Sequence, residues 1–507
     1  MSEWLSDIFV YNPDEPMLFT RLSFWTFFGV LLLLYSLIYK KNAIRNVYLF
    51  AMSLFFYYKT GGYFFSLLIF STIVDYTLGN LIYTNKIKWK KKLFVALSVI
   101  VNLGLLSYFK YAYFYTDIIN RIFNTDLEVV NLLAVWSNNL TGSAFDVSTI
   151  ILPVGISFYT FQTISYTVDV YREKTKPVKN ILDFGFYVSF FFFFLAGPIV
   201  RASEFVPQLY KKYQVSKREF GLALFLILNG LIKKMLISDY LSINFVDRIF
   251  ADPSAYSGFE NMMAIYGYSL QIYCDFSGYT DIAIGVALLL GFRLPWNFNS
   301  PYKAANITDF WRRWHISLST WLRDYLYIPL GGNRKGKIRT YINLMITMLL
   351  GGLWHGAALR FIIWGGLHGI GLAIHKAWMQ IFGKPDTGKK SFFGHLISVF
   401  FTFHLVTFAW IFFRAQDMKT AGIMINRMFN NFSGSKVPQM IESYWIIFAL
   451  MLGGFIIHWL PKSFKDKYTN WFIQMPIWIK VLIAVIVVII LYQAKSAEIQ
   501  PFIYFQF

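Results

Sequence analysis

Residues 309–321 read DFWRRWHISLSTW and residues 351–356 read GGLWHG, and these two motifs decide how the chain is interpreted. The first motif is basic, rich in tryptophan and contains His315. The second places His355 among glycines. An apolar run joins them, so the central region 309–356 holds both histidines in a chain whose other segments are typical of membrane helices. We interpret those segments as the scaffold of the two histidines.

The composition is that of an integral membrane protein. Of the 507 residues, 56% are hydrophobic and 15% are charged, whereas soluble domains have about 25% charged residues. Apolar runs recur without a polar linker, so we expect a single membrane domain over residues 1–507. At roughly 20 residues per span, they predict an all-α polytopic fold with about eleven transmembrane helices. Glycine and proline breaks after Ile150, for example in 184–199, predict re-entrant and interfacial helices around a central funnel.

The net charge of +20 comes from short lysine and arginine clusters between apolar runs. Such clusters follow the positive-inside rule, which places them on the cytoplasmic side and the N-terminus outside. We therefore expect membrane lipid as a partner and no binding of nucleic acid. The first apolar run follows an acidic segment rather than a basic one, so we expect it to remain as a membrane anchor.

Residues 309–325 are amphipathic when they are placed on a helix of 3.6 residues per turn. The large apolar side chains of one face are Trp311, Trp314, Leu318, Trp321, Leu322 and Tyr325. His315 falls at the edge of that face, while Arg312, Arg313 and Arg323 fall on the opposite side. The pattern predicts one continuous helix at the cytoplasmic boundary, with its arginines toward water or phosphate. A membrane-surface helix without catalytic function is the alternative interpretation.

His355 lies inside a predicted span, where the surrounding glycine and alanine allow close helix approach or leave room for a substrate chain. An imidazole can exchange a proton near neutral pH, so a histidine at this depth is a functional candidate. A core histidine bonded to a backbone carbonyl is the alternative. His368 has a similar but weaker setting, and we expect it to be structural.

No phosphate-binding loop, paired-cysteine motif, His-Glu-x-x-His motif or nucleophile elbow occurs in the chain, and we predict no metal site. A histidine general base is the chemistry that remains. Two carboxylates, Asp275 and Asp281, also fall in a predicted span. We expect them to face the bundle interior, with hydrogen bonds supplied locally by Gly278, Tyr279 and Thr280.

Four motifs along the chain resemble those of the membrane-bound O-acyltransferase superfamily. They are QIYCDFSGY at 271–279, PWNF at 295–298, WRRWH at 311–315 and LWHG at 353–356. Within the superfamily, the likeness is to bacterial alginate O-acetyltransferases and related proteins of cell-envelope polysaccharide acetylation. This resemblance implies an enzyme of the bacterial inner membrane. It implies that His355 is the catalytic histidine near mid-membrane and that His315 is the second conserved histidine, toward the cytoplasmic mouth.

The resemblance also implies the substrates and partners. The donor is expected to be acetyl-coenzyme A or another acyl thioester, with no permanently bound cofactor, and the acceptor an extracytoplasmic polysaccharide. Arg312, Arg313 and Arg323 are candidates for binding the donor phosphates, or they anchor the helix at the membrane edge. The chain contains no hydrolase-type nucleophile for the final transfer. We therefore expect a separate extracytoplasmic acetyltransferase that resembles SGNH hydrolases.

The C-terminal segment 495–507 is an aromatic tail that ends in PFIYFQF and is too short to span a membrane. It resembles the terminal Phe-x-Tyr-x-x-Phe motif of the teichoic-acid D-alanylation system. That likeness implies that Tyr504 accepts the acyl group with His355 as the base. The alternative is an aromatic anchor at the membrane interface.

Two other functions stay open at the level of the sequence. A transporter or flippase of a lipid-linked glycan would use Asp275, Asp281 and the histidines as a proton or substrate path. A docking scaffold would only hold a separate extracytoplasmic transferase.

Overall fold

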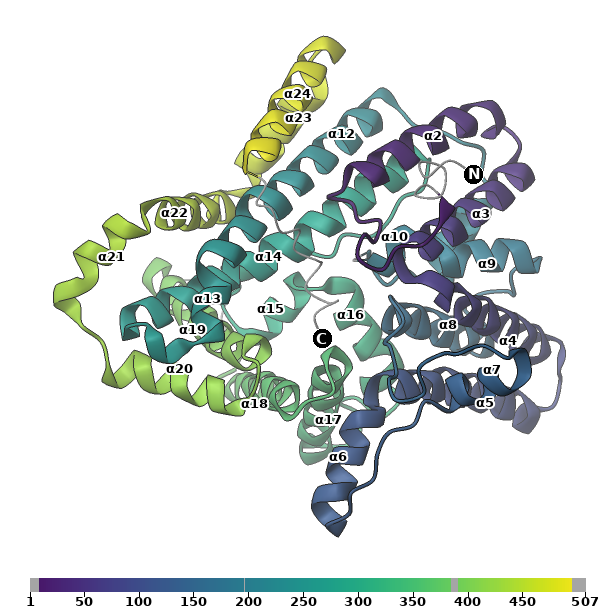
Figure 1. Ribbon diagram of the computed structural model, residues 1–507, viewed down its shortest axis with the longest axis horizontal. Coiled ribbons are helices and arrows are strands. Elements are labelled where there is room, and N and C mark those ends of the chain that lie inside the picture. Colours follow the sequence, from purple (N-terminus) through teal and green to yellow (C-terminus); the bar gives the residue numbers. More distant parts are fainter. Residues whose placement is uncertain (1–8, 196, 384–390, 495–507) are drawn as a thin grey trace. The chain divides into compact units, whose positions relative to one another are not determined.

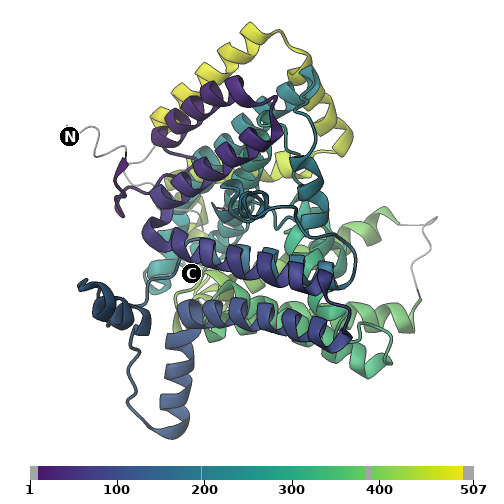
Figure 2. The same ribbon diagram turned by 90° about the vertical axis from the view of Figure 1, so that its right-hand side faces the viewer.

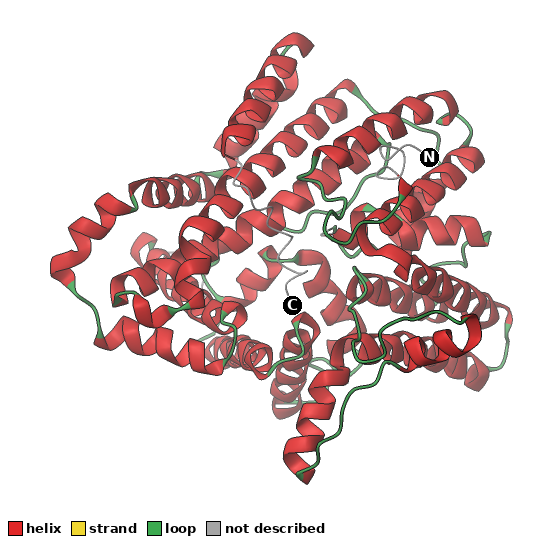
Figure 3. Ribbon diagram, in the orientation of Figure 1, coloured by secondary structure: helices red, strands yellow, loops and turns green. Residues whose placement is uncertain are grey.

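The computed structural model describes residues 9–195, 197–383 and 391–494, and within these ranges the chain is helical and contains no strand (Figure 1, Figure 3). This confirms the all-α fold class. The aromatic tail 495–507, with Tyr504, lies outside the described residues.

The chain divides into two compact units. Among the described residues, unit 1 comprises 9–195, 199–212 and 356–358, and unit 2 comprises 197–198, 213–355, 359–383 and 391–494. Both histidines of the central motifs belong to unit 2.

Unit 1 is built around α8, almost every residue of which is buried because α4, α5 and α9 pack against it. Figure 2 shows α4 and α5 side by side. A buried carboxylate, Asp75 of α4, accepts hydrogen bonds from Ser98 Oγ (2.5 Å) and Asn102 Nδ2 (2.8 Å) of α5. The α-helices of unit 1 are α2 (Leu22–Ile38), α3 (Asn42–Gly61), α4 (Phe65–Thr84), α5 (Lys88–Leu106), α6 (Ala112–Phe123), α7 (Leu132–Thr141), α8 (Ile156–Tyr171), α9 (Ile181–Ser189), α10 (Phe192–Leu195) and α11 (Ala202–Leu209).

The segment expected to be re-entrant folds as two short helices, α9 and α10. The nine residues of α9 extend about 14 Å at 1.5 Å per residue, which is less than half of the roughly 30 Å hydrocarbon core. This segment is therefore too short for a helix that spans the membrane, and its re-entrant course stays a prediction.

Unit 2 is built around α14 (Gly258–Leu289), a 32-residue helix that is buried along most of its length. It packs along α12 (Lys217–Leu231), which continues as the π-helical segments η3 (Ile232–Asp239) and η4 (Ser242–Val246) and ends with α13 (Asp247–Ala251). Glycines permit this approach: a β-carbon on Gly230 would lie 2.5 Å from the carbonyl oxygen of Gly278. Of this pair, α14 contacts the first central motif through the ring of Phe276.

The remaining elements of unit 2 follow α14 in the chain. They are α15 (Ile307–Arg313), α16 (Ile316–Trp321), the π-helical η7 (Leu322–Tyr327), α17 (Lys337–His355), α18 (Leu359–Ile381), α19 (Phe392–Arg414), α20 (Met418–Asn430), α21 (Val437–Ser443), α22 (Trp445–Trp459), α23 (Lys462–Gln474) and α24 (Ile477–Ala494). The helices α17 and α18 pack against each other along their lengths (Figure 1).

Six helical runs in the described ranges are long and apolar enough to cross a membrane. A seventh results if the bent pair 434–443 and 445–459, which turns by 88°, is one span. The protein is thus polytopic, but the predicted number of about eleven spans is not confirmed. The expected first span, for example, folds as the 17-residue helix α2, which is shorter than the roughly 20 residues that a membrane requires. The central funnel stays a prediction.

Candidate active site

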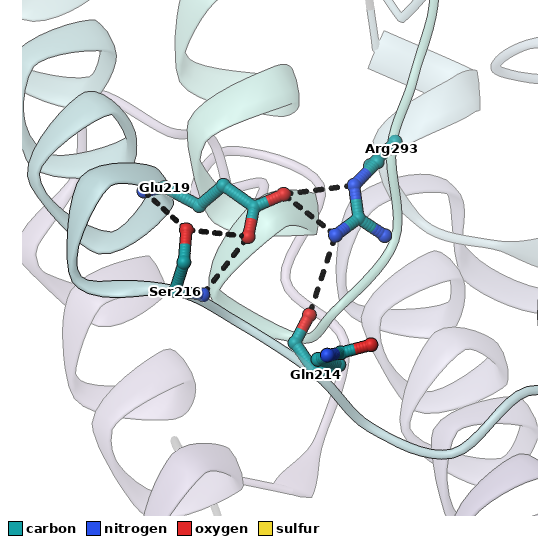
Figure 4. Close-up of polar contacts among 4 residues, drawn as sticks. All are labelled: Gln214, Ser216, Glu219 and Arg293. Carbon is teal, nitrogen blue, oxygen red and sulfur yellow. Dashed lines mark hydrogen bonds and ion pairs between the residues drawn. The ribbon is translucent and has the colours of Figure 1, made fainter.

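The loop after α14 is anchored to the start of α12 (Figure 4). Arg293 contacts Oε1 of Glu219 through Nη2 (2.6 Å) and Nε (2.8 Å). Glu219 also forms a capping box with Ser216, since Ser216 N donates to its Oε2 (2.9 Å). Tyr213 donates from its hydroxyl to the carbonyl oxygen of Leu289 (3.1 Å). These contacts hold the loop that leads to the PWNF motif.

The first central motif is not one continuous helix, so the prediction for residues 309–325 was wrong in this respect. The helix α15 ends at Arg313, α16 begins at Ile316, and the turn from Leu322 is π-helical. His315 lies at the break with φ of 42°, in the left-handed region that non-glycine residues seldom adopt. It is fully buried rather than at the edge of a surface helix.

The PWNF loop is the physical reason for the break, because its backbone and one side chain replace the lost helical hydrogen bonds. Ile316 N donates to Asn297 O (3.0 Å), and Ser317 N donates to Asn297 Oδ1 (3.1 Å). On the other side of the break, Asn299 N donates to Arg313 O (2.9 Å). Asn297 is itself fully buried, so the loop is inserted between the two short helices. The partners of the broken helix thus come from a distant part of the chain.

The predicted amphipathicity is confirmed. Of the apolar face, the side chains of Trp311, Trp314, Leu318, Trp321 and Leu322 are buried, and that of Tyr325 is half-buried. The rings of Phe276 and His315 lie 4.6 Å apart in an edge contact, so α14 supplies one wall around this histidine. The ring of Trp354, from α17, lies 6.2 Å from it.

His355 is the last residue of α17, and 3% of its surface is exposed. Three aromatic rings surround its imidazole: Trp354 at 4.9 Å, Trp364 of α18 at 5.0 Å and Phe413 of α19 at 5.2 Å. A β-carbon on Gly352 would collide with the carbonyl oxygen of Phe361. The close helix approach expected from the glycines around His355 is therefore confirmed.

One aromatic cluster contacts both histidines. We define it as Phe310, Trp311, Trp314, Trp354, Trp364, Trp410 and Phe413 in unit 2. Six of these rings form a continuous set of contacts, and Trp354 joins them through the ring of His355. Trp354 touches His315 on one side and His355 on the other. The tertiary structure therefore joins the two motifs into one site.

His368 belongs to the same site, although the sequence predicted only a structural role. Its ring lies 4.7 Å from Trp364 and 5.2 Å from Trp311. Neither ring nitrogen has a hydrogen-bond partner among the residues that the structure describes. The signal in the sequence was its spacing from Trp364, which places both on one face of α18.

The three arginines expected to bind donor phosphates differ in their surroundings. Arg313 pairs with Asp309 (2.9 Å) and Arg323 with Asp324 (2.7 Å). Arg312 is exposed, and no carboxylate of the described residues lies within 4.0 Å of it. Tyr504 lies outside the described residues, so its distance from this site stays open.

Three ion pairs in the interior of unit 2 were missed by sequence reasoning, of which only Lys234–Asp275 is buried on both sides. Lys234 of η3 contacts Asp275 at 2.6 Å and Asp239 at 2.7 Å, and Lys233 contacts Asp281 at 2.7 Å. Asp275 and Asp281 face the bundle interior as expected, and their charged partners come from the neighbouring helical segment. Packing of α12 and η3 on α14 brings lysines to them, and opposite charges in a dry interior attract strongly. Adjacent lysines inside an apolar run were the available signal.

The arrangement suits proton transfer in a water-poor setting. The imidazole of His355 is enclosed by aromatic rings, which exclude water and competing hydrolysis. Within the described ranges, no group of three or more histidine, cysteine, aspartate or glutamate side chains could hold a metal ion.

The family model for the membrane-bound O-acyltransferase family matches residues 18–415. A probable alginate O-acetylase of Pseudomonas putida is 39% identical over 432 residues, covering 84% of this chain and 83% of that protein. The peptidoglycan O-acetyltransferase of Helicobacter pylori is 38% identical over 410 residues, covering 76% and 73%. The teichoic acid D-alanyltransferase of Bacillus subtilis is 30% identical over 279 residues, covering 52% and 69%.

Proposed function

Because the chain belongs to the membrane-bound O-acyltransferase family, we propose that it transfers acetyl groups from a cytoplasmic thioester toward an extracytoplasmic polysaccharide. It is a multi-pass membrane protein and an acyltransferase. The observation that carries the proposal is the enclosure of His355 by Trp354, Trp364 and Phe413, in one cluster with His315. This is a setting for a base that acts away from water.

His355 acts as the general base of the transfer. It takes the proton of an acceptor hydroxyl as the hydroxyl oxygen attacks the thioester carbonyl carbon. The carbon–sulfur bond then breaks, and the leaving thiolate takes up the proton. A positioned base of this kind contributes roughly 10² to 10⁴-fold to the rate. His315 lies on the path between the donor and this base, through its shared contact with Trp354.

The donor is acetyl-coenzyme A or another acyl thioester on the cytoplasmic side. Arg312 is the first candidate for its phosphates, because it is exposed and has no carboxylate partner among the described residues. Arg313 and Arg323 would have to exchange Asp309 and Asp324 for phosphate oxygens. Phosphate groups bind arginine through charge-assisted hydrogen bonds.

Tyr504 is the first acceptor in this proposal. Its phenol takes the acyl group as an ester, and a separate extracytoplasmic transferase passes the group to the polymer. The names of the relatives, which refer to alginate, peptidoglycan and teichoic acid, support a cell-envelope polymer as the final acceptor. The proposed location is the inner membrane, between the cytoplasmic donor and this polymer. In this orientation the N-terminus is extracytoplasmic.

The experiment uses the purified full chain and acetyl-coenzyme A with a labelled acetyl group. His355→Ala is expected to lower release of the label by roughly 10² to 10⁴-fold. His395→Ala is the matched control, because His395 is exposed near the start of α19 and should leave the rate unchanged.

Equal rates for the wild type and His355→Ala would contradict the proposal. Movement of a lipid-linked glycan without acyl turnover would point to the flippase instead. Polymer acetylation that survives His355→Ala but is lost when the tail 495–507 is deleted would point to a docking scaffold.

A further inference from the structure

An apolar groove lies between α14, α19 and α22 in unit 2. Its volume is about 580 Å³, which is in the range of pockets that hold small molecules. Its lining includes Tyr266, Phe403, Met451, Phe455, Ile456 and Trp459. Every lining residue is apolar or aromatic, so the groove suits a hydrocarbon chain.

The groove is open along α22. Leu452 is 64% exposed, Ile456 54% and Trp459 46%. These residues belong to α22, the longer half of the bent apolar helix pair 434–443 and 445–459. Exposed apolar side chains of a helix embedded in the membrane face lipid rather than water. Trp459 ends the helix, a position typical of tryptophan at the membrane interface. The groove therefore opens toward acyl chains near the level of the headgroups.

Two lysines lie where the groove ends. Lys303 donates from Nζ to the carbonyl oxygen of Leu460 (2.6 Å), a residue of the groove lining. Lys465 of α23 donates from Nζ to His458 O (2.7 Å) and to Ser300 Oγ (3.0 Å). Both ammonium groups are thus held beside one end of an apolar groove.

These two lysines carry charge that acidic side chains do not balance. Among the residues that the structure describes, neither has a carboxylate oxygen within 4.0 Å. The neighbouring cations, by contrast, have acidic partners: Lys233 pairs with Asp281, and Arg313 pairs with Asp309.

Electrostatics agree with the geometry at this end of the groove. Burial, followed by repulsion from Lys303 and Lys233, lowers the pKa of Lys465 to about 8. A bound anion would relieve that repulsion, because an opposite charge nearby favours the charged form of lysine.

We propose that this groove binds an anionic phospholipid, with one acyl chain on the aromatic lining and the phosphate at Lys303 and Lys465. The apolar groove selects a hydrocarbon chain, and the lysine pair selects a negative headgroup. A free phosphate would use the lysines alone and leave the groove unfilled. The site shares no residue with the proposed acyl-transfer machinery, so it adds a lipid partner to that function.

The test is native mass spectrometry of the purified full chain, which counts the lipids retained. Phosphatidylglycerol is compared with phosphatidylcholine of the same acyl chains. The wild type is expected to retain phosphatidylglycerol preferentially. Lys303→Gln and Lys465→Gln are each expected to weaken retention about fivefold, the effect of one basic residue near an anionic membrane surface. Lys465→Arg keeps the positive charge and should retain phosphatidylglycerol like the wild type.

Two matched controls separate the site from general charge and hydrophobicity. Lys467→Gln removes an exposed lysine from the same helix, α23, and should leave retention unchanged. Ile456→Trp fills the groove without changing any charge and should reduce retention. Ile457→Trp alters a neighbour of equal exposure, 53%, that does not line the groove, and should not.

Equal retention of the two phospholipids by the wild type would overturn the proposal. So would an equal loss in Lys465→Gln and Lys467→Gln. Displacement of phosphatidylglycerol by glycerol 3-phosphate would show that the lysines bind a free phosphate and that the groove plays no part. If His355→Ala loses acyl transfer but retains phosphatidylglycerol like the wild type, lipid binding is independent of the proposed acyl-transfer function.

Discussion

Gly352 of α17 and Gly365 of α18 lie back to back, so that a β-carbon on Gly352 would come within 3.2 Å of the α-carbon of Gly365. The same β-carbon would collide with the carbonyl oxygen of Phe361, and one on Gly365 would collide with that of Met348. Because both obstacles are backbone atoms, side-chain rotation cannot relieve them. This contact fixes α18, with Trp364, against the end of α17 that carries His355.

Gly365→Ala is therefore expected to push the two helices apart. Overpacking of this kind costs about 1–3 kcal/mol, and it should lower both the thermal stability in detergent and the rate of acyl transfer. Gly366→Ala is the matched control, because its β-carbon would meet only Leu349 Cδ2 at an ordinary 3.7 Å. Equal melting temperatures for the two variants would argue against a tight contact at Gly365.

Asn297→Ala should disturb His315 without touching it. The substitution removes the side-chain acceptor of Ser317 N at a buried helix start, a loss that costs about 1–3 kcal/mol. Lower acyl-transfer activity and lower thermal stability are expected together. Asn297→Asp keeps the oxygen acceptor and should retain more activity. Asn299→Ala is the control, because the side chain of Asn299 is exposed on the same loop. A loss of activity and stability in Asn299→Ala as large as in Asn297→Ala would contradict the prediction.

Lys234→Met should be strongly destabilising, because it leaves Asp239 and Asp275 buried without their shared cation. Breaking a buried ion pair from one side costs about 3–5 kcal/mol. The unfolding temperature of the purified chain measures this effect. Lys335→Met, in an exposed loop, should change it little. Adding Asp275→Leu to Lys234→Met should recover part of the loss, and a further loss instead would contradict the pairing.

Tyr504→Phe separates binding of the donor from delivery of the acyl group to the polymer. If Tyr504 carries the acyl ester, the variant should still bind the donor thioester, whereas acetylation of the envelope polymer in cells should be abolished. Tyr492→Phe, at an exposed position of α24, is the control. Normal polymer acetylation in Tyr504→Phe would exclude the tyrosine ester.

Retention of phosphatidylglycerol should depend on pH through Lys465, which belongs to a helix outside the candidate spans. Its pKa of about 8 means that the free protein loses this charge as the pH rises from about 7 to about 9. Lipid retention should therefore fall over that interval. The titratable groups that face Lys465 are Lys303, Lys233 and His458. In Lys465→Gln, lipid retention should depend on pH much less than in the wild type. The same pH dependence in the variant and the wild type would contradict the role of Lys465.

Much of the fold followed from local pattern. Apolar runs of spanning length indicated a polytopic helical protein, and a period of 3.6 identified the tryptophan face that the structure buries, including Trp314 and Leu318. Glycines around His355 indicated a close helix contact. Side chains three and four residues apart must share a helical face, so these features need no knowledge of the remaining chain.

Other features arose only in the tertiary structure. The motif 309–321 has a sequence that suits an unbroken helix, and it breaks at His315 because Asn297 arrives from the loop after α14 with competing hydrogen bonds. The partners of Asp275 and Asp281 likewise come from another helix. A backbone group or a buried charge is satisfied by whatever atom packing brings near. The sequence by itself thus determined the helical fold class and the apolar faces that would be buried, because these follow from local periodicity. The packing of distant segments decided which polar groups would be buried and what each of them would contact.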